Sequence, residues 1–210
     1  MSDLLNNIAE AVLDGDKTGV RKLVQEAVDE GIAADIILAD GLLAGMNEVG
    51  ALFKDGEMFV PEVLVSAKAL QGGIDIIRPA LAEKGITTSG KILTVTVEGD
   101  LHDIGIKLVG LMLEGAGFEV VNIGIDKTAD EIIEKFKEVK PNILGMSAML
   151  TTTMGHMKVV AERMAAEVPN DAIIMIGGAP TSPAFAEKLG VFYAADANDA
   201  VEVAKKILSI

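Results

Sequence analysis

The pattern of apolar and polar positions divides the chain into a helical first part and a second part in which strands and helices alternate. Between residues 1 and 83, apolar residues recur at steps of three and four, as in Val20, Leu23, Val24 and Ala27. No continuously apolar or alternating run in this part predicts a strand. Short, glycine-containing connections separate four helical stretches, so the pattern predicts an antiparallel four-helix bundle.

A polar segment with glycines at both ends, Gly85 to Gly90, separates the two parts. We place a domain boundary there, with a helical domain over residues 1–88 and a second domain over 89–210.

In the second domain, short apolar, β-branched runs alternate with stretches of helical periodicity. Strands are predicted near 91–97, 118–123, 143–147, 172–176 and 191–194, and helices near 104–116, 128–139, 153–167, 182–189 and 199–208. Thr128 and Glu131 form a capping box at the start of the second of these helices, and the run Thr151-Thr152-Thr153 is interpreted as the cap of the third. Such alternation is typical of a parallel sheet with helices on both faces. The predicted fold class is therefore α + α/β, with a helical bundle followed by a flavodoxin-like (Rossmann-like) five-stranded sheet in the order 2-1-3-4-5.

Composition narrows the class of protein and its compartment. The formal net charge of −14 makes nucleic acid an unfavourable partner. The absence of cysteine excludes disulfides, thiolate metal sites and cysteine nucleophiles, and is compatible with a reducing cytoplasm. The first residues lack the pattern of a signal peptide, and no uninterrupted apolar stretch approaches membrane-spanning length. We expect a cytoplasmic protein without a membrane partner.

Candidate functional residues follow the predicted strands that lie side by side in this sheet order. Ligands bind beyond the carboxyl ends of strands 1, 3 and 4 in such folds. The segments at those ends are 98–102 with an acid and a histidine, 147–151 with hydroxyls, and 177–180 with two glycines. The sequence therefore predicts a binding site built from these three segments.

Several familiar occupants of such a site fit poorly. A phosphoryl-receiver domain would need an acid where Ser147 stands, and a flavin phosphate would be repelled by Asp100 and Asp103. A zinc site needs three or four protein ligands, but the chain has two histidines and no cysteine. A triad of Ser147, His102 and Asp100 is conceivable, although the serine is not set in a Gly-x-Ser-x-Gly turn.

The residues favour a large ligand that needs one nitrogen donor. Asp100 and His102 are two residues apart, so in an extended segment their side chains project the same way. The carboxylate can then accept the imidazole N–H and raise the basicity of the other ring nitrogen as a metal ligand. A hydroxyl such as Ser147 can extend this relay, and Gly177-Gly178 leave a slot for something flat and bulky.

These residues resemble the fingerprint of a known family. Asp100-x-His102-x-x-Gly105 looks like the Asp-x-His-x-x-Gly motif of cobalamin-binding domains. The 41 residues between Gly105 and Ser147, and the 27 between Met149 and Gly177, resemble that family's spacing to its Ser-x-Leu and Gly-Gly elements. Residues 45–63 of the bundle closely resemble the helical cap that precedes this domain in methionine synthase and in corrinoid proteins of anaerobic methyltransferase systems.

The resemblance implies roles for individual residues. His102 would be the lower axial ligand of cobalt in a cobalamin or related corrinoid, in place of the cofactor's own dimethylbenzimidazole, with Asp100 and Ser147 as the relay behind it. The other implied cofactor-binding residues are Asp103, Ile104 and Gly105 at the lower corrin face, Met149, Thr151 beside the nucleotide tail, Gly177, Gly178 and Ala179 along the slot of that tail, and Phe59 over the upper face. Met149 replaces the leucine of the family, a nearly volume-conserving change.

The function that this resemblance implies is that of a corrinoid methyl carrier. Such a protein accepts a methyl group on Co(I) from a partner substrate methyltransferase. It then presents methyl-Co(III) to a second methyltransferase, whose acceptor is coenzyme M or tetrahydrofolate. A reductive activation protein would be a third partner, and the chain would be a subunit with no catalytic residue of its own, not a complete catalyst.

Two other classes remain open. A cobalamin-dependent sensor or regulator resembles this arrangement of cap and domain but usually adds a DNA-binding module. The small subunit of an adenosylcobalamin mutase normally lacks the helical cap.

Overall fold

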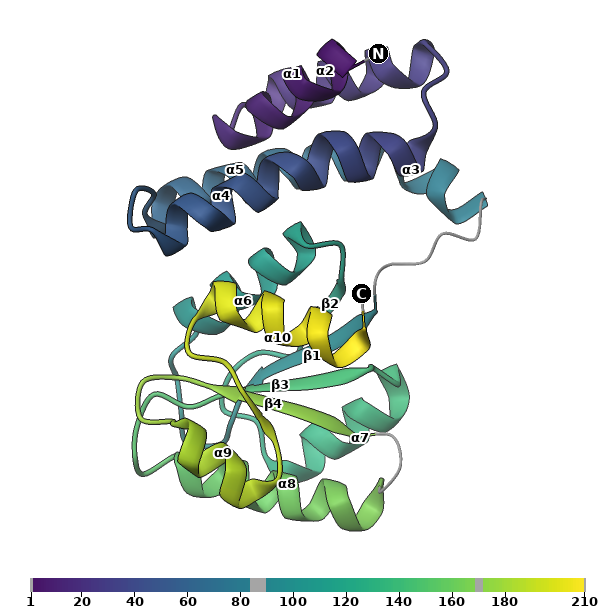
Figure 1. Cartoon of the computed structure of the whole chain (residues 1–210). Helices are drawn as coiled ribbons and strands as arrows, with labels where there is room; N and C mark the ends of the chain where they lie inside the picture. The colour runs from purple at the N-terminus through teal and green to yellow at the C-terminus, as the bar shows by residue number, and fades with distance from the viewer. Residues whose placement is uncertain (1, 84–89, 169–171, 210) are drawn as a thin grey trace. The chain divides into compact units, whose positions relative to one another are not determined.

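A computed structural model of the chain describes residues 2–83, 90–168 and 172–209. The chain forms two compact units, Met1–Thr88 with Glu114–Gly117 and Ser89–Leu113 with Phe118–Ile210. The predicted boundary at 88/89 falls on residues 84–89, outside the described residues, and stays a prediction. Each unit is described by itself below (Figure 1).

The first unit is helical over its described residues, as the sequence pattern predicts. Asp16 caps the second helix by accepting hydrogen bonds from the N–H groups of Thr18 and Gly19, at 3.1 and 2.9 Å. Buried apolar positions at helical spacing, such as Val20 and Val24, form one packed side of this helix. The helices are α1 (Ser2–Leu13), α2 (Lys17–Asp29), α3 (Ala34–Ile36), η1 (Ile37–Leu43), α4 (Ala44–Lys54) and α5 (Val60–Glu83).

The long helix Ala34–Lys54 contains a π-helical segment, Ile37–Leu43, that its periodicity did not predict. Glycines let α1 come close to it: a side chain at Gly41 would meet Ile8, and one at Gly45 would collide with the backbone of Ala9.

By length and composition the same helix is long and apolar enough to span a membrane, although Asp35, Asp40 and Glu48 interrupt its apolar residues. Its residues Ile37, Leu42 and Val49 are fully buried, as in a core helix of a bundle.

The second unit has the strand and helix alternation that the sequence predicts, with ends that differ by one or two residues. Its strands are β1 (Lys91–Thr96), β2 (Glu119–Asn122), β3 (Ile143–Ser147), β4 (Ile173–Gly177) and β5 (Phe192–Tyr193). Its helices are α6 (Ile104–Gly115), α7 (Ala129–Val139), α8 (Met154–Glu167), α9 (Pro183–Leu189) and α10 (Ala197–Leu208). The strands are all parallel and ordered β2-β1-β3-β4-β5, which confirms the predicted fold class.

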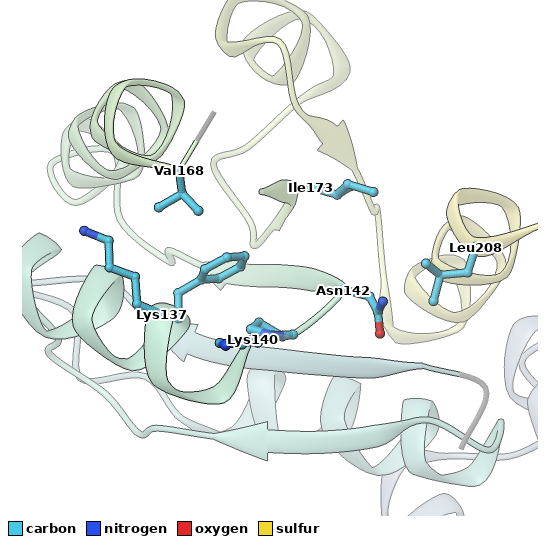
Figure 2. Close-up of a pocket in the computed structure, with 8 residues that line it drawn as sticks. Lys137, Lys140, Asn142, Val168, Ile173 and Leu208 are labelled. Carbon is cyan, nitrogen blue, oxygen red and sulfur yellow. The ribbon is translucent and has the colours of Figure 1, made fainter. Parts of the chain in front are cut away.

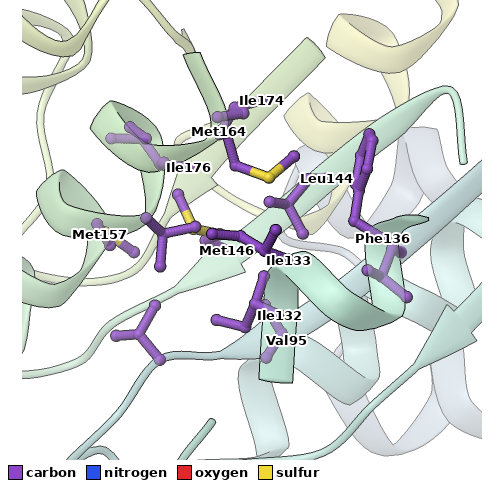
Figure 3. Packing of buried hydrophobic residues seen from close by; sticks show 14 of the residues in the cluster. Val95, Ile132, Ile133, Phe136, Leu144, Met146, Met157, Met164, Ile174 and Ile176 are labelled. Carbon is purple, nitrogen blue, oxygen red and sulfur yellow. The ribbon is translucent and has the colours of Figure 1, made fainter. Parts of the chain in front are cut away.

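One face of this sheet is packed with large aliphatic side chains (Figure 3). Val95, Met146 and Ile176 point from neighbouring strands toward α7 and α8, where Ile133 and Met157 are buried against them. Since residues in register on parallel strands face the same side, the whole face is continuous. It forms the hydrophobic core that fixes the strands.

Toward the carboxyl ends of the three central strands, the opposite face carries small and polar residues, with Met175 as the one large apolar side chain. We call it the open face and define it by two rows in register: Thr94, Gly145 and Met175, then Thr96, Ser147 and Gly177 nearer the carboxyl edge. Figure 1 shows α6 and α10 on this side of the sheet and α7, α8 and α9 on the other.

Candidate functional site

The loop after β1 is held in one conformation by contacts from three directions. Gly99 has a positive φ of 79°, which a glycine adopts without strain, and its N–H donates to the Asp126 carboxylate at 2.8 Å. The N–H of Asp126 in turn donates to the Asp100 carbonyl at 3.1 Å. The Thr96 hydroxyl donates to the His102 carbonyl at 3.0 Å. The loop therefore presents Asp100 and His102 from a fixed backbone.

Asp100 is fully buried, and its carboxylate accepts hydrogen bonds on both oxygens. Oδ1 accepts from the His102 N–H at 3.1 Å and lies 2.7 Å from the His102 Nδ1. Oδ2 accepts from the Met149 N–H at 2.6 Å and from the Thr153 hydroxyl at 2.8 Å. This carboxylate joins the loop after β1 to the segment after β3, as the sequence predicts for the two strand ends.

The charge of Asp100 follows from these contacts. Burial by itself would raise the pKa of the carboxyl, but the hydrogen bonds from Met149, His102 and Thr153 outweigh it and lower the pKa to about 2. At neutral pH the carboxylate has no proton to share, so the short contact requires the Nδ1 of His102 to be the donor. The Nε2 of His102 is then the nitrogen with a free lone pair.

His102 presents that nitrogen outward. Its side chain is 53% exposed, although its hydrogen-bond partner is completely buried. Leu101 and Ile104 beside it are large apolar residues that stand 69% and 75% exposed. Exposed aliphatic side chains on both sides of an exposed imidazole are unfavourable in water. They indicate a surface that binds a large, partly apolar ligand.

The predicted residues that flank this site lie in the same two loops. Asp103 forms an ion pair with Lys107 at the start of α6, and Gly105 is exposed, with nothing near the position of a side chain. Met149 is 38% exposed, and its N–H contributes to the network of Asp100. Thr151 is exposed, and no hydrogen bond in the described part of the chain involves its side chain.

The hydroxyl that holds Asp100 is that of Thr153, which the sequence suggested only as a helix cap. Thr153 is buried, and as the residue before α8 it makes no side-chain capping bond. Ser147, the predicted third member of the relay, is largely buried at the end of β3, but the hydrogen bonds of Asp100 do not include it. A hydroxyl six positions further along the chain thus takes the predicted contact, and Ser147 stays a prediction as a cofactor contact.

The predicted glycine pair lies at the carboxyl end of β4, next to the end of β3. Gly178 has a φ of 115°, and a side chain there would collide with the Ala148 backbone, so the two loops approach as closely as glycine permits. Gly177 closes the row of Thr96 and Ser147 on the open face, while Ala179 beyond it is exposed. The close approach of the two loops thus explains why glycine stands at position 178, and the role of the pair beside a ligand stays a prediction.

Phe59 belongs to the other unit. It lies directly before α5, is 67% exposed, and its N–H donates to the Glu62 carboxylate at 2.8 Å. An aromatic ring this exposed is unusual for a helical bundle, and its proposed place over the upper corrin face stays a prediction.

The donor set fits a group that brings its own metal and needs one more ligand. In residues 2–83, 90–168 and 172–209, no cluster of three or more histidines and carboxylates could hold a free metal ion. His156 lies 3.4 Å from Glu98 in an exposed pair, apart from the network of Asp100. One oriented imidazole is sufficient for a corrinoid, whose macrocycle supplies the remaining nitrogens. The residues present therefore fit that cofactor.

An open pocket of about 610 Å³ lies elsewhere on the second unit (Figure 2). It is lined by Asn142 directly before β3, Ile173 at the start of β4, and Lys137 and Lys140 near the end of α7. These are the amino ends of the strands, away from the edge that carries Asp100 and His102. Its size alone does not make it the functional site, because it lacks the buried carboxylate and oriented imidazole.

Comparison with known families and structures agrees with this geometry. Residues 90–204 match the model of a B12 binding domain, and residues 4–78 match a second model that is also described as a B12 binding domain. Two models of one cofactor class thus cover most of the chain.

Three relatives match the chain over nearly its full length. A corrinoid protein of Desulfitobacterium hafniense is 41% identical over 98% of this chain and 97% of its own. A dimethylamine corrinoid protein of Methanosarcina barkeri is 40% identical over 99% and 98%. The structure of the methanol:cobalamin methyltransferase complex of Methanosarcina barkeri superimposes with a TM-score of 0.87 and 31% identity over 99% of this chain and 80% of that chain. The chain therefore belongs to the corrinoid proteins of methyltransferase systems, which carry a cobalamin or related corrinoid.

Proposed function

We propose that this protein is the methyl carrier of a methyltransferase system and passes a methyl group from a substrate methyltransferase to a second methyltransferase. The observation that carries the proposal is the exposed imidazole of His102, fixed by the buried carboxylate of Asp100 at the carboxyl edge of the sheet. The relatives include a dimethylamine and a trimethylamine corrinoid protein, which supports a role in methylamine metabolism. Coenzyme M or tetrahydrofolate is the proposed final acceptor.

The corrinoid, when bound, supplies a cobalt centre that can take up a methyl group and give it up again. His102 would hold the cobalt of that cofactor through Nε2, while its Nδ1–H donates to the Oδ1 of Asp100. That hydrogen bond fixes the tautomer and raises the basicity of Nε2. Thr153 and the Met149 N–H hold the other oxygen of Asp100, so the ring cannot turn away without breaking a buried network.

The charge of Asp100 fixes which ring nitrogen of His102 is available. The pKa of about 2 keeps the carboxylate ionised at neutral pH, so it stays an acceptor for the Nδ1–H. Only Nε2 is then left to bind a metal.

Phe59 in the helical unit is the exposed aromatic residue that we propose as a shield of the upper corrin face, because an apolar ring excludes water from a strongly nucleophilic metal. A reductive activation protein, which restores the reactive oxidation state, completes the proposed set of partners in the cytoplasm.

The test is transfer of an isotopically labelled methyl group. The protein, reconstituted with reduced corrinoid, is mixed separately with methyltransferases for methylamines, methanol, betaines and methoxylated aromatic compounds. We expect label to become protein-bound with one of them, and then to pass to coenzyme M or tetrahydrofolate when the second methyltransferase is added. His156→Ala is the matched control and should behave as the wild type.

Two results would contradict the proposal. If the protein binds the corrinoid but takes label from none of these enzymes, it is not a carrier for these donors. If it binds adenosylcobalamin in preference to methylcobalamin, the mutase subunit is the better assignment.

A further inference from the structure

The open face contains one polar atom that the protein leaves without a partner. Thr94 on β1 is completely buried, and its hydroxyl is the buried side-chain group without a hydrogen bond among the described residues. Its neighbour on the same face, Thr96, donates its own hydroxyl to the His102 carbonyl. Burying an unpaired hydroxyl costs free energy, and native proteins rarely leave one unsatisfied without a reason.

The position of Thr94 places this hydroxyl deep in the open face. It lies two residues below Thr96, which corresponds to about 7 Å along the strand, counted from the edge that carries His102. In register beside it stands Gly145, where a side chain would meet only ordinary contacts, 3.6 Å from the Thr94 methyl group. Gly145 thus has no side chain beside the unpaired hydroxyl, although a first side-chain carbon would fit there without a collision.

The surroundings of Thr94 indicate the chemistry of a ligand group that would pair with this hydroxyl. The row below it on the same face is Ile92, Ile143 and Ile173, and the third residue of its own row is Met175. No cation is present in either row, so the position suits a neutral ring and not a phosphate. A corrinoid carries one neutral aromatic ring, the base at the outer end of its nucleotide tail.

We propose that the Thr94 hydroxyl hydrogen-bonds a polar group on the lower base of the bound corrinoid, so that the protein prefers corrinoids whose base carries such a group. The inference rests on the proposed function, because it assumes that His102 displaces the base and that the tail enters the open face. Every displaced base has the ring nitrogen released from cobalt, so the proposal concerns the opposite edge of the ring. Dimethylbenzimidazole has two methyl groups on that edge, whereas a hydroxybenzimidazole has a hydroxyl there and a purine has ring nitrogens or an amino group.

The test compares corrinoid binding by the wild type and two variants. Thr94→Val removes the hydroxyl but keeps the shape and suits a strand, whereas Thr94→Ser keeps the hydroxyl. Dissociation constants are measured by absorption titration with four compounds: corrinoids with dimethylbenzimidazole, hydroxybenzimidazole or adenine as base, and cobinamide, which has no nucleotide. The denaturant midpoint of the corrinoid-free protein is measured alongside.

We expect the wild type to bind one or both corrinoids with a polar base about 10-fold more tightly than the one with dimethylbenzimidazole. The better of the two identifies which group Thr94 contacts. Thr94→Val should lose this preference and leave cobinamide binding unchanged, and Thr94→Ser should retain it. The corrinoid-free Thr94→Val protein should be as stable as the wild type or more stable, since the unpaired hydroxyl is gone.

Three outcomes would overturn the assignment. The first is a wild type that binds all three complete corrinoids equally, and the second is a Thr94→Val protein with unchanged ratios between them. The third is a Thr94→Val substitution that weakens cobinamide binding, relative to the wild type, as much as it weakens binding of the complete corrinoids. None of these touches the carrier role, which is measured by methyl transfer, whereas a wild type that binds no corrinoid at all would contradict the proposed function and the inference together.

Discussion

The two faces of the parallel sheet are built from the same strands but differ completely in their side chains. On one face, Leu93, Leu144 and Ile174 form a row of large aliphatic residues packed against α7 and α8. On the other, one residue further along each strand, the row is Thr94, Gly145 and Met175. Successive side chains on a strand point to opposite faces, so the two rows are interleaved along the chain.

This difference assigns different tasks to the two faces. The aliphatic face contributes the burial of apolar area that holds the strands in register. The open face contributes less to packing. Its row of Thr96, Ser147 and Gly177 lies next to the carboxyl edge of the sheet, where Asp100 and His102 are. A strand whose residues are all buried can therefore carry a core on one side and the proposed binding surface on the other.

The largest expected effect comes from an aliphatic-face substitution. Leu144 is fully buried in the core, so Leu144→Ala leaves a cavity and should lower the free energy of unfolding by about 3 kcal/mol. Urea denaturation of the corrinoid-free protein measures this loss. If Leu144→Ala is as stable as the wild type, the aliphatic face does not carry the fold.

The matched substitution on the open face should affect binding instead of stability. Gly145→Val places a branched side chain next to Thr94, and its first carbon meets the methyl group of that residue at an ordinary distance of 3.6 Å. The corrinoid-free protein should keep its stability to within about 1 kcal/mol, because valine suits a strand better than glycine does.

Binding of a complete corrinoid by Gly145→Val should weaken by roughly 30-fold or more, as overpacking of a filled site predicts. Cobinamide, which lacks the nucleotide tail, should bind as it does to the wild type. Equal weakening for both compounds, measured by absorption titration, would mean that the tail does not enter the open face.

A smaller effect is expected at the loop that the open face supports. Asp126 holds Gly99 and Asp100 through two hydrogen bonds, one of them made by its side chain. Asp126→Ala removes that side-chain acceptor and should weaken corrinoid binding by roughly 5-fold, corresponding to about 1 kcal/mol. Asp126→Asn keeps the acceptor oxygen and should remain close to the wild type in the same titration. If both variants bind like the wild type, the loop does not depend on this contact.

The fold could be predicted almost completely from the sequence, because its signals are local. The β-branched run at Lys91–Thr96 and the capping box at Thr128 and Glu131 are both present in the structure. The π-helical segment Ile37–Leu43 was not predicted, because the periodicity of apolar residues does not distinguish it from the α-helical residues on either side.

The sequence predicted the pair Asp100 and His102 but not the residues that hold this pair in place. The two-residue spacing of Asp100 and His102 was sufficient to predict their hydrogen bond, because both residues lie in one loop. Thr153 and Asp126 are 53 and 27 positions from the groups that they hold, so only the tertiary fold brings them there. The run of three threonines after β3 was a signal for Thr153, but it was interpreted as a helix cap.

The central claim, that His102 is the lower ligand of cobalt, can be tested by electron paramagnetic resonance of the bound corrinoid in its Co(II) state. The protein is labelled with nitrogen-15 in histidine only and loaded with unlabelled corrinoid. We predict that the nitrogen splitting changes from a triplet to a doublet in wild type and in His156→Ala, and that it is absent in His102→Ala. A splitting that stays a triplet in the labelled wild type would show that the cofactor's own base is the ligand and would contradict the account.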